Sequence, residues 1–338
     1  MHIDATLMAR NASRSNAIPL YVSAVCSYLP PRIETAAEIA QKIGKTEKWV
    51  IEKAGVRRRH VSDECLPSMA AKAASLAIEK SGMPDLLISA SATPHQTLPD
   101  NSAFIAAELG LSGIPCFSVH SSCLSFLTAL RIGAGFFQSD VYKKILIVSA
   151  EIATPARNFS EPESAALLGD GAAAVMLECP SGDRKSSLLS WRSATFPAGI
   201  AFTEVRGGGL RRHPLSETTV KGDYLFTMNG PALYRLAIGA VRDLVAVVLQ
   251  DAGMSLDDID VVVPHQASGL AMAGAGKALG VPEHKVIKVI ENQGNCVAAS
   301  MPLALAEAQA RGALVPGTLV LLIGTGAGVN VGAAILRW

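Results

Sequence analysis

Three residues of this sequence have the type and surroundings needed for thioester chemistry, and the first is Cys123. It follows two serines and precedes an apolar helical pattern over 124–138. A thiol at a helix N-terminus lies near free backbone N–H groups and the positive end of the helix dipole, so we expect a lowered pKa. A free cysteine is also commonly a plain buried side chain, so Cys123 alone assigns no function.

His265 and Asn295 are the other two residues. His265 follows the apolar run 261–264, at the carboxyl end of a predicted strand, where functional residues gather in open α/β sheets. Asn295 follows Gly294 in a turn of small residues. Taken singly, the histidine can be structural and the asparagine a turn or helix cap. A thiolate facing both side chains is a coherent site for nucleophilic chemistry on thioesters.

An internal repeat gives a reason to place these residues together. Pro-His-Gln occurs at 94–96 and again at 264–266, an offset of 170 residues. Leu-Gly pairs at 109–110 and 279–280 share that offset and close the helix predicted after each tripeptide. The period is far too long for a solenoid, so it indicates a duplicated α/β unit with a pseudo-twofold axis.

The repeat continues into the turns that carry the chemistry. An apolar strand is expected after each helix, at 114–119 and at 285–290. The first strand leads to the turn of Cys123 and the second to the turn of Asn295. A pseudo-twofold axis places these two turns opposite each other, with His265 at the start of the second unit.

The remaining apolar patterns alternate between strands and helices. We expect strands at 18–27, 86–92, 114–120 and 144–150, and helices at 36–43, 47–54, 67–81, 102–109 and 124–138. Strands that are apolar on both faces and separated by helices predict a layered α/β fold. We divide the chain into an N-terminal extension (1–17), a half with the nucleophile (18–182) and a half with the histidine and asparagine (183–338).

Composition excludes several classes of protein. Of the 338 residues 49% are hydrophobic and 17% charged, and the net charge is +1, which predicts a large core and no nucleic-acid partner. Six cysteines without a CxxC pair argue against a disulfide framework or a zinc site and favour the cytoplasm. No secretory leader is evident.

The uncharged stretch 312–336 is broken by proline and glycines, so we expect two strands joined by a glycine turn and no membrane span.

Several ordered motifs carry a family resemblance. They are 27–31, 46–57, 122–126, 168–172, 264–267, 294–295 and the glycine loop 324–328. With them, the chain resembles 3-oxoacyl-(acyl carrier protein) synthase III and its relatives in the thiolase superfamily, from Ile18 to Trp338. The resemblance implies a five-layer αβαβα fold of two pseudo-symmetric halves and a homodimer.

The same resemblance implies an activity and a set of site residues. Cys123 takes an acyl group from a thioester, a malonyl-type thioester then loses carbon dioxide, and His265 and Asn295 stabilise the enolate that attacks the acyl group. The backbone N–H groups of Cys123 and Ala327 form the oxyanion hole. Acyl-coenzyme A or acyl carrier protein supplies the substrates, and the reaction needs no metal or other cofactor.

Coenzyme A binding and substrate choice follow less directly from the resemblance. It implies that Trp49, Lys53 and Arg57 contact coenzyme A. Leu270 stands where relatives that use acyl carrier protein commonly have a basic residue, and Pro162 where many have an arginine. These departures favour a specialised relative over one that initiates housekeeping fatty-acid synthesis.

Other functions remain open at this point. The same fold serves head-to-head acyl condensation, acyl transfer to an alcohol or amine, thioester hydrolysis and non-catalytic partner subunits. A papain-like protease is disfavoured because its cysteine signature is missing. A thiolase would need a second catalytic cysteine after Cys296, and a hydroxymethylglutaryl-type synthase a glutamate base near 96–100; neither is present.

Overall fold

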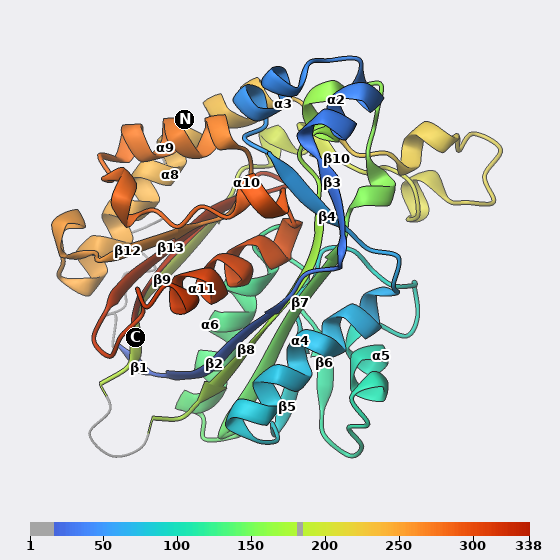
Figure 1. The fold of residues 1–338 in the computed structure, drawn as a ribbon. Helices are drawn as coiled ribbons and strands as arrows, with labels where there is room; N and C mark the ends of the chain where they lie inside the picture. The colour runs from blue at the N-terminus through green and yellow to red at the C-terminus, as the bar shows by residue number, and fades with distance from the viewer. Residues whose placement is uncertain (1–16, 181–184) are drawn as a thin grey trace.

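The structure is a computed structural model that describes residues 17–180 and 185–338 (Figure 1). Nearly all of the predicted N-terminal extension (1–17) and the predicted boundary between residues 182 and 183 therefore lie outside the described residues.

Two five-stranded sheets form the frame of the molecule. The first contains, in spatial order, β2 (Tyr21–Tyr28), β8 (Asp170–Glu178), β7 (Lys144–Ile152), β5 (Leu86–Ser89) and β6 (Cys116–Ser118). The second contains β1 (Ile18–Pro19), β9 (Ser187–Thr195), β14 (Asn330–Arg337), β13 (Leu319–Gly326) and β12 (Val261–Pro264). In each sheet a parallel pair, β5 with β7 or β12 with β13, lies beside antiparallel strands. This shared order is the structural form of the repeat seen in the sequence.

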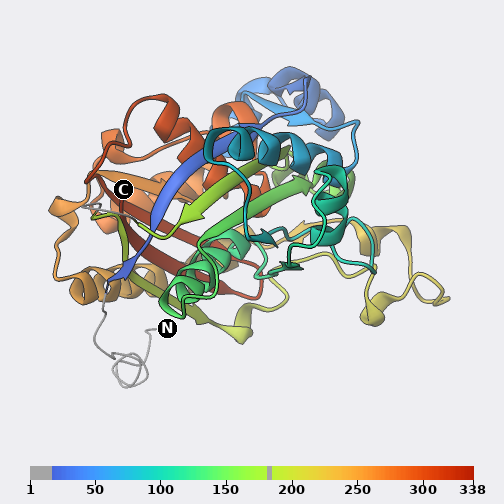
Figure 2. The same cartoon turned by 90° about the horizontal axis from the view of Figure 1, so that it is seen from below.

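Helices fill the space between the sheets and cover their outer faces. The middle layer is α6 (Ser125–Gln138) with α11 (Ser300–Ala310), whose apolar side chains pack with both sheets in one core. α4 (Leu66–Ser81) and α5 (Asn101–Glu108) cover the first sheet, and α8 (Gly230–Ala252) covers the second. Figures 1 and 2 show this order of layers from two directions. The predicted five-layer αβαβα class is confirmed.

A small unit near the N-terminus lies at one end of the sheets (Figure 1). It joins the hairpin β3 (Arg32–Thr35) and β4 (Arg58–Val61) to α2 (Ala36–Ile43) and α3 (Glu47–Lys53). α2 starts with a capping box and ends at Gly44, whose φ of 64° suits glycine. α3 packs against α9 (Gly269–Leu279) of the second half, which places this small unit beside the histidine half.

Shorter elements connect these units. They are α7 (Pro162–Ala165), α10 (Ile290–Gln293), the pair β10 (Thr203–Glu204) with β11 (Thr227–Met228), and the 3-10 turns η1 (Thr154–Ala156), η2 (Pro197–Gly199), η3 (Leu210–Arg212), η4 (Lys221–Tyr224), η5 (Leu256–Asp258), η6 (Glu283–Lys285) and η7 (Val297–Ala299).

One predicted strand is wrong. Instead of a strand over 285–290, the chain makes a single parallel bridge from Val286 to Val262 and then enters α10. The cause is the side chain of Gln266, which occupies backbone groups of this segment that a neighbouring strand would otherwise pair. The predicted strand at 114–120 forms but is shorter, as β6.

The uncharged C-terminal stretch forms two strands, β13 and β14, joined by a glycine turn as predicted. In the part of the chain that the structure describes, none of the helices combines the length and apolar character needed to cross a bilayer.

Candidate active site

The glycine-rich end of β13 brings the histidine and the cysteine turn together. A Cβ atom at Gly324 would lie 2.8 Å from Cβ of His265 and 2.9 Å from Cδ2 of Leu124. A Cβ atom at Gly326 would lie 3.4 Å from the backbone nitrogen of Cys123. Glycine at these positions therefore lets the turn of Cys123 in the first half and the histidine of the second half approach the same strand end.

The turn that carries Cys123 is held in an uncommon conformation. Ser122, directly before the cysteine, has a φ of 50°, which a residue with a side chain seldom adopts. Ser125 stabilises the turn, because its hydroxyl accepts from the Ser121 N–H at 2.9 Å and donates to the Ser122 carbonyl at 2.7 Å. The helix α6 starts two residues after Cys123, as the sequence led us to expect.

The pKa of Cys123 departs from our expectation. The pKa of the thiol is raised to about 12, mainly by burial and also by the nearby Glu151 carboxylate. The N–H groups of Ala327 and of Cys123 itself hydrogen-bond the sulfur and lower the pKa, but by less. The prediction of a lowered pKa is wrong. It took account of the helix N-terminus, but the desolvation of the sulfur, which has the larger effect, cannot be read from the sequence.

His265 lies at the end of β12 with only 5% of its surface exposed. Its backbone N–H donates to the carbonyl of Ile323 at 2.8 Å. Its Nδ1 atom is buried, and no described residue hydrogen-bonds it. Burial lowers the pKa of the ring to about 4, so the imidazole is neutral at pH 7. A neutral ring without a protein partner is available to hydrogen-bond a ligand.

Gln266, the residue directly after His265, is fully buried. Its amide makes four hydrogen bonds, from Nε2 to the carbonyls of Pro264 (2.8 Å) and Ile287 (3.1 Å) and to Oε1 from the N–H groups of Val289 (3.0 Å) and Ile290 (3.2 Å). The side chain thereby replaces the ladder of a missing strand and ties β12 to the segment that leads to Asn295.

Asn295 keeps one amide hydrogen free among its described contacts. Its Nδ2 donates to the carbonyl of Ala267 at 3.2 Å, two residues beyond His265, and its Oδ1 accepts from the N–H of Val297 at 2.9 Å. An amide nitrogen has two hydrogens, so a second donor remains. Val297 has a φ of 45°, a strained value for a β-branched residue.

The turn of Asn295 rests on the first half of the chain. The N–H of Asn295 donates to the carbonyl of Leu167 at 2.8 Å, and the N–H of Gly169 donates to the carbonyl of Asn295 at 3.0 Å. A Cβ atom at Gly169 would lie 2.2 Å from the carbonyl oxygen of Gln293, so this close approach needs glycine. The Leu-Gly-Asp-Gly motif at 168–171 thus provides a backbone platform for the asparagine.

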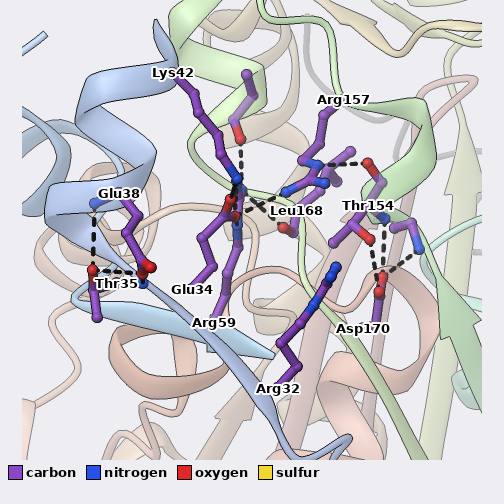
Figure 3. Close-up of polar contacts among 12 residues, drawn as sticks. Arg32, Glu34, Thr35, Glu38, Lys42, Arg59, Thr154, Arg157, Leu168 and Asp170 are labelled. Carbon is purple, nitrogen blue, oxygen red and sulfur yellow. Dashed lines mark hydrogen bonds and ion pairs between the residues drawn. The ribbon is translucent and has the colours of Figure 1, made fainter. Parts of the chain in front are cut away.

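A buried arginine stabilises that platform (Figure 3). Arg59 is fully buried, and its guanidinium donates to the carbonyls of Ala165 at 2.6 Å and Leu168 at 2.9 Å and to Glu34 at 2.7 Å. Glu34 also forms an ion pair with Arg157, in which Nη1 of Arg157 lies 2.8 Å from Oε2 of Glu34. Nothing in the local sequence pattern indicates that Arg59 is buried and paired.

Glu151 is a second residue that sequence reasoning missed. Its fully buried carboxylate accepts from the N–H groups of Ala92 at 2.6 Å and Thr93 at 3.0 Å, and from Ala298 of the second half. Burial raises the pKa of Glu151 to about 7. The only available signal was a charged residue inside the apolar strand pattern of β7.

A cavity of about 640 Å³ leads to His265. Its lining includes the exposed Lys53 and the partly exposed Trp49, and it also includes the buried His265 and the partly buried Thr325. Arg57 does not line the cavity and instead lies 3.6 Å from Glu291 in an ion pair. Among the described residues, no cluster of His, Cys, Asp and Glu side chains is suited to a metal ion.

Known proteins are similar to this chain in sequence and in fold. The family model of 3-oxoacyl-[acyl-carrier-protein] synthase III matches residues 117–195, and that of its C-terminal region matches residues 249–338. A beta-ketoacyl-[acyl-carrier-protein] synthase III of Rickettsia rickettsii (strain Sheila Smith) is 32% identical over 92% of this chain and 97% of its own length. The chain belongs to the 3-oxoacyl-(acyl carrier protein) synthase III family.

Other members of the synthase III family agree with this assignment. The synthase III 2 of Deinococcus radiodurans is 35% identical over 94% of both chains. The crystal structure of the synthase III of Pseudomonas aeruginosa PAO1 has a TM-score of 0.86 at 28% identity, and covers 95% of this chain and 98% of its own. The predicted family is confirmed, and so is the predicted class of enzyme, a condensing acyltransferase.

Proposed function

We propose that Cys123, His265 and Asn295 form the catalytic set of this condensing enzyme, with the N–H groups of Cys123 and Ala327 as its oxyanion hole. The observation that carries the proposal is that both N–H groups reach the Cys123 sulfur. Donors placed there also lie close to the oxygen of a carbonyl that the sulfur attacks. The unpartnered ring of His265 beside the same strand end supplies the second half of the site.

In the first step Cys123 takes the acyl group. The sulfur attacks the carbonyl carbon of the thioester, the bond to the carrier sulfur breaks, and the thiol proton ends on the departing carrier thiol. Because the pKa of Cys123 is raised to about 12, the free enzyme carries a neutral thiol at pH 7. Such a thiol resists alkylation and oxidation until an acyl thioester binds.

In the second step a malonyl-type thioester loses carbon dioxide. The electron pair left on C2 spreads to the thioester oxygen, which accepts hydrogen bonds from the neutral ring of His265 and the free amide hydrogen of Asn295. C2 then attacks the acyl carbonyl, the bond to Cys123 breaks, and the sulfur recovers a proton. Neither residue has to transfer a proton, which suits a histidine whose pKa is lowered to about 4.

We further propose that coenzyme A or acyl carrier protein delivers both thioesters through the cavity, past Trp49 and Lys53 of its lining. Arg57 contributes at most at the outer rim, since it lies outside the lining. The active unit is a homodimer of chains, each divided near residue 182 into the two halves described above. No metal or further cofactor takes part.

The test is intact-protein mass spectrometry after incubation with a panel of acyl-coenzyme A and acyl-carrier thioesters. We expect an acyl adduct on the wild type and none on Cys123→Ala. The matched control is Cys116→Ala, which removes another partly buried thiol. An adduct that survives Cys123→Ala, or no adduct with any donor on folded protein, would contradict the assignment and favour a non-catalytic partner subunit.

A further inference from the structure

The cavity at His265 has a large apolar portion of its lining. This portion comes from α8, from the end of α9 and the residues after it, and from the face of β12 and β13 that α8 covers. Six apolar side chains, here called the apolar arm, line this portion: Val241, Val262, Leu279, Val281, Val286 and Ile323. None of them can pair with a carrier phosphate or an amide, so the arm suits a hydrocarbon chain.

The space in the arm follows from the sequence of α9. Of the eleven residues of this helix only Met272 is buried, although most are apolar. Gly276 lies one turn after Met272 on the same face, and a Cβ atom there would meet nothing within 4 Å. A Cβ atom at Gly274 would lie 2.6 Å from the hydroxyl of Tyr234, a residue of α8. The helix is therefore in close contact with α8 at Gly274 and borders open space at Gly276.

The arm adjoins His265 and not the nucleophile. Ile323, one of the arm residues, accepts the backbone hydrogen bond of His265 at 2.8 Å. Cys123 is absent from the residues that line this cavity within the described part of the chain. A chain in the arm would hang from the thioester held by His265, whereas the acyl group on Cys123 needs space elsewhere.

We propose that the apolar arm binds an unbranched alkyl chain carried by C2 of the second thioester. This inference rests on the proposed function and names its second substrate as a 2-alkylmalonyl-type thioester. The bond from C2 to the carboxylate breaks, carbon dioxide leaves, and C2 forms a bond to the acyl carbonyl as the bond to the Cys123 sulfur breaks. The product is a 2-alkyl-3-oxoacyl thioester, and Cys123 recovers a proton.

The test is calorimetric binding of coenzyme A analogues in which an amide replaces the thioester, so that they resist decarboxylation. Cys123→Ala protein is titrated with the 2-methyl-, 2-butyl- and 2-hexylmalonyl forms. Each methylene that enters the arm is expected to lower the Kd about fourfold. The hexyl form should therefore bind at least a hundredfold more tightly than the methyl form. Equal or weaker binding of the hexyl form would overturn the proposal.

Two further substitutions locate the chain. Gly276→Leu, in the Cys123→Ala background, fills the arm and should abolish the gain in affinity from the methyl to the hexyl form. The Kd of the methyl form should stay within about twofold of its value without Gly276→Leu. Ala273→Leu, on the exposed side of the same helix, should keep the whole gain. If Gly276→Leu weakens all three analogues equally, the arm holds the carrier and the proposal is wrong.

The octanoyl analogue carries the same hexyl chain on C2 without the carboxylate. If the octanoyl analogue also binds more tightly than the 2-methylmalonyl form, and if Gly276→Leu removes this gain in affinity, the arm is the alkyl site. The chain is then assigned to a plain acyl thioester. This binding experiment does not depend on the acyl adduct. An adduct on Cys123 without any gain from longer chains would overturn this inference alone, whereas a gain without an adduct would overturn the condensing site alone.

Discussion

The tripeptide Pro-His-Gln occurs once in each half of the molecule and has two different environments. At 94–96 all three residues are exposed, and Gln96 reaches only the carbonyl of Leu98 two residues on. At 264–266 the histidine and the glutamine are buried, and the glutamine makes four hydrogen bonds. The letters are the same, yet one copy supports a site and the other forms a surface loop.

The two copies differ in the strand pairing that surrounds them. In the first half β6 pairs with β5, so the sheet completes its own ladder. In the second half the corresponding segment makes one bridge only, at Val286, and the Gln266 amide takes over the missing pairing. A duplicated sequence can thus keep its motif while the burial around it decides which copy holds a reactive group.

Substituting the two histidines should give the largest contrast. We expect His265→Ala to lower the rate of condensation by about 10²–10³, because it removes a donor to the developing enolate. The rate of condensation of His95→Ala should stay within about twofold of the wild-type rate. Stopped-flow measurement on enzyme already acylated at Cys123 isolates this step. Equal effects of the two substitutions would remove the functional distinction between the two tripeptides.

The two glutamines should differ in stability. Gln266→Leu leaves the N–H groups of Val289 and Ile290 and the carbonyl of Ile287 without partners, and we expect the free energy of unfolding to fall by about 4 kcal/mol. Gln96→Leu should change it by less than about 0.5 kcal/mol. Urea titration followed by circular dichroism measures both. A small loss for Gln266→Leu would show that the missing ladder does not need the amide.

The pH dependence of unfolding should report the buried histidine of the second tripeptide. The pKa of His265 is lowered from 6.5 to about 4, so between these values the unfolded chain binds more protons than the folded one. Stability therefore rises with pH across that window and is lost as the pH falls from 6.5 toward 4. Wild type should lose roughly 3 kcal/mol relative to His265→Gln over this range.

The comparison with a variant is needed because Glu151 acts in the opposite sense. Its pKa is raised from 4.5 to about 7, so its contribution is complete below pH 4.5 and is lost as the pH rises through about 7. The contribution is the same in both proteins and cancels in the difference. A parallel pH dependence for His265→Gln and wild type would refute the low pKa.

The smallest expected effect concerns the nucleophile half. Glu151→Gln removes a negative charge that raises the pKa of Cys123, so the thiolate fraction at pH 8 should rise and alkylation by iodoacetamide should become up to about tenfold faster. Peptide mass spectrometry reports the rate at Cys123 and, as internal controls, at the exposed Cys65 and Cys179. Slower alkylation of Cys123 would mean that the carboxylate mainly holds the turn in place.

Much of the fold was predictable because burial leaves its record in apolar periodicity. The strands on either side of α6, the helix α2 and the glycine turn between β13 and β14 all follow from such patterns. The missing strand at 285–290 was not predictable. The segment is apolar enough to form a strand, and only a side chain remote in sequence, that of Gln266, takes its place.

The site was predictable to a different extent. The turn of Cys123 and the position of His265 followed from strand ends, and the turn of Asn295 followed from the repeat although the strand expected before it does not form. Their catalytic roles remain a prediction. The raised pKa of the thiol and the buried positions of Arg59 and Glu151 were not predictable. They depend on desolvation and on contacts between the halves, which no local pattern records.

The platform at Leu167 and Gly169 has a consequence for synthesis of the protein on the ribosome. When these residues leave the exit tunnel, the turn that will pair with them lies more than a hundred residues further along the message. At about 5–20 residues per second, the nascent first half waits several seconds with this carbonyl and N–H unpaired. A product of premature termination before Asn295 would therefore carry the thiol of Cys123 but would lack the turn that pairs with Leu167 and Gly169.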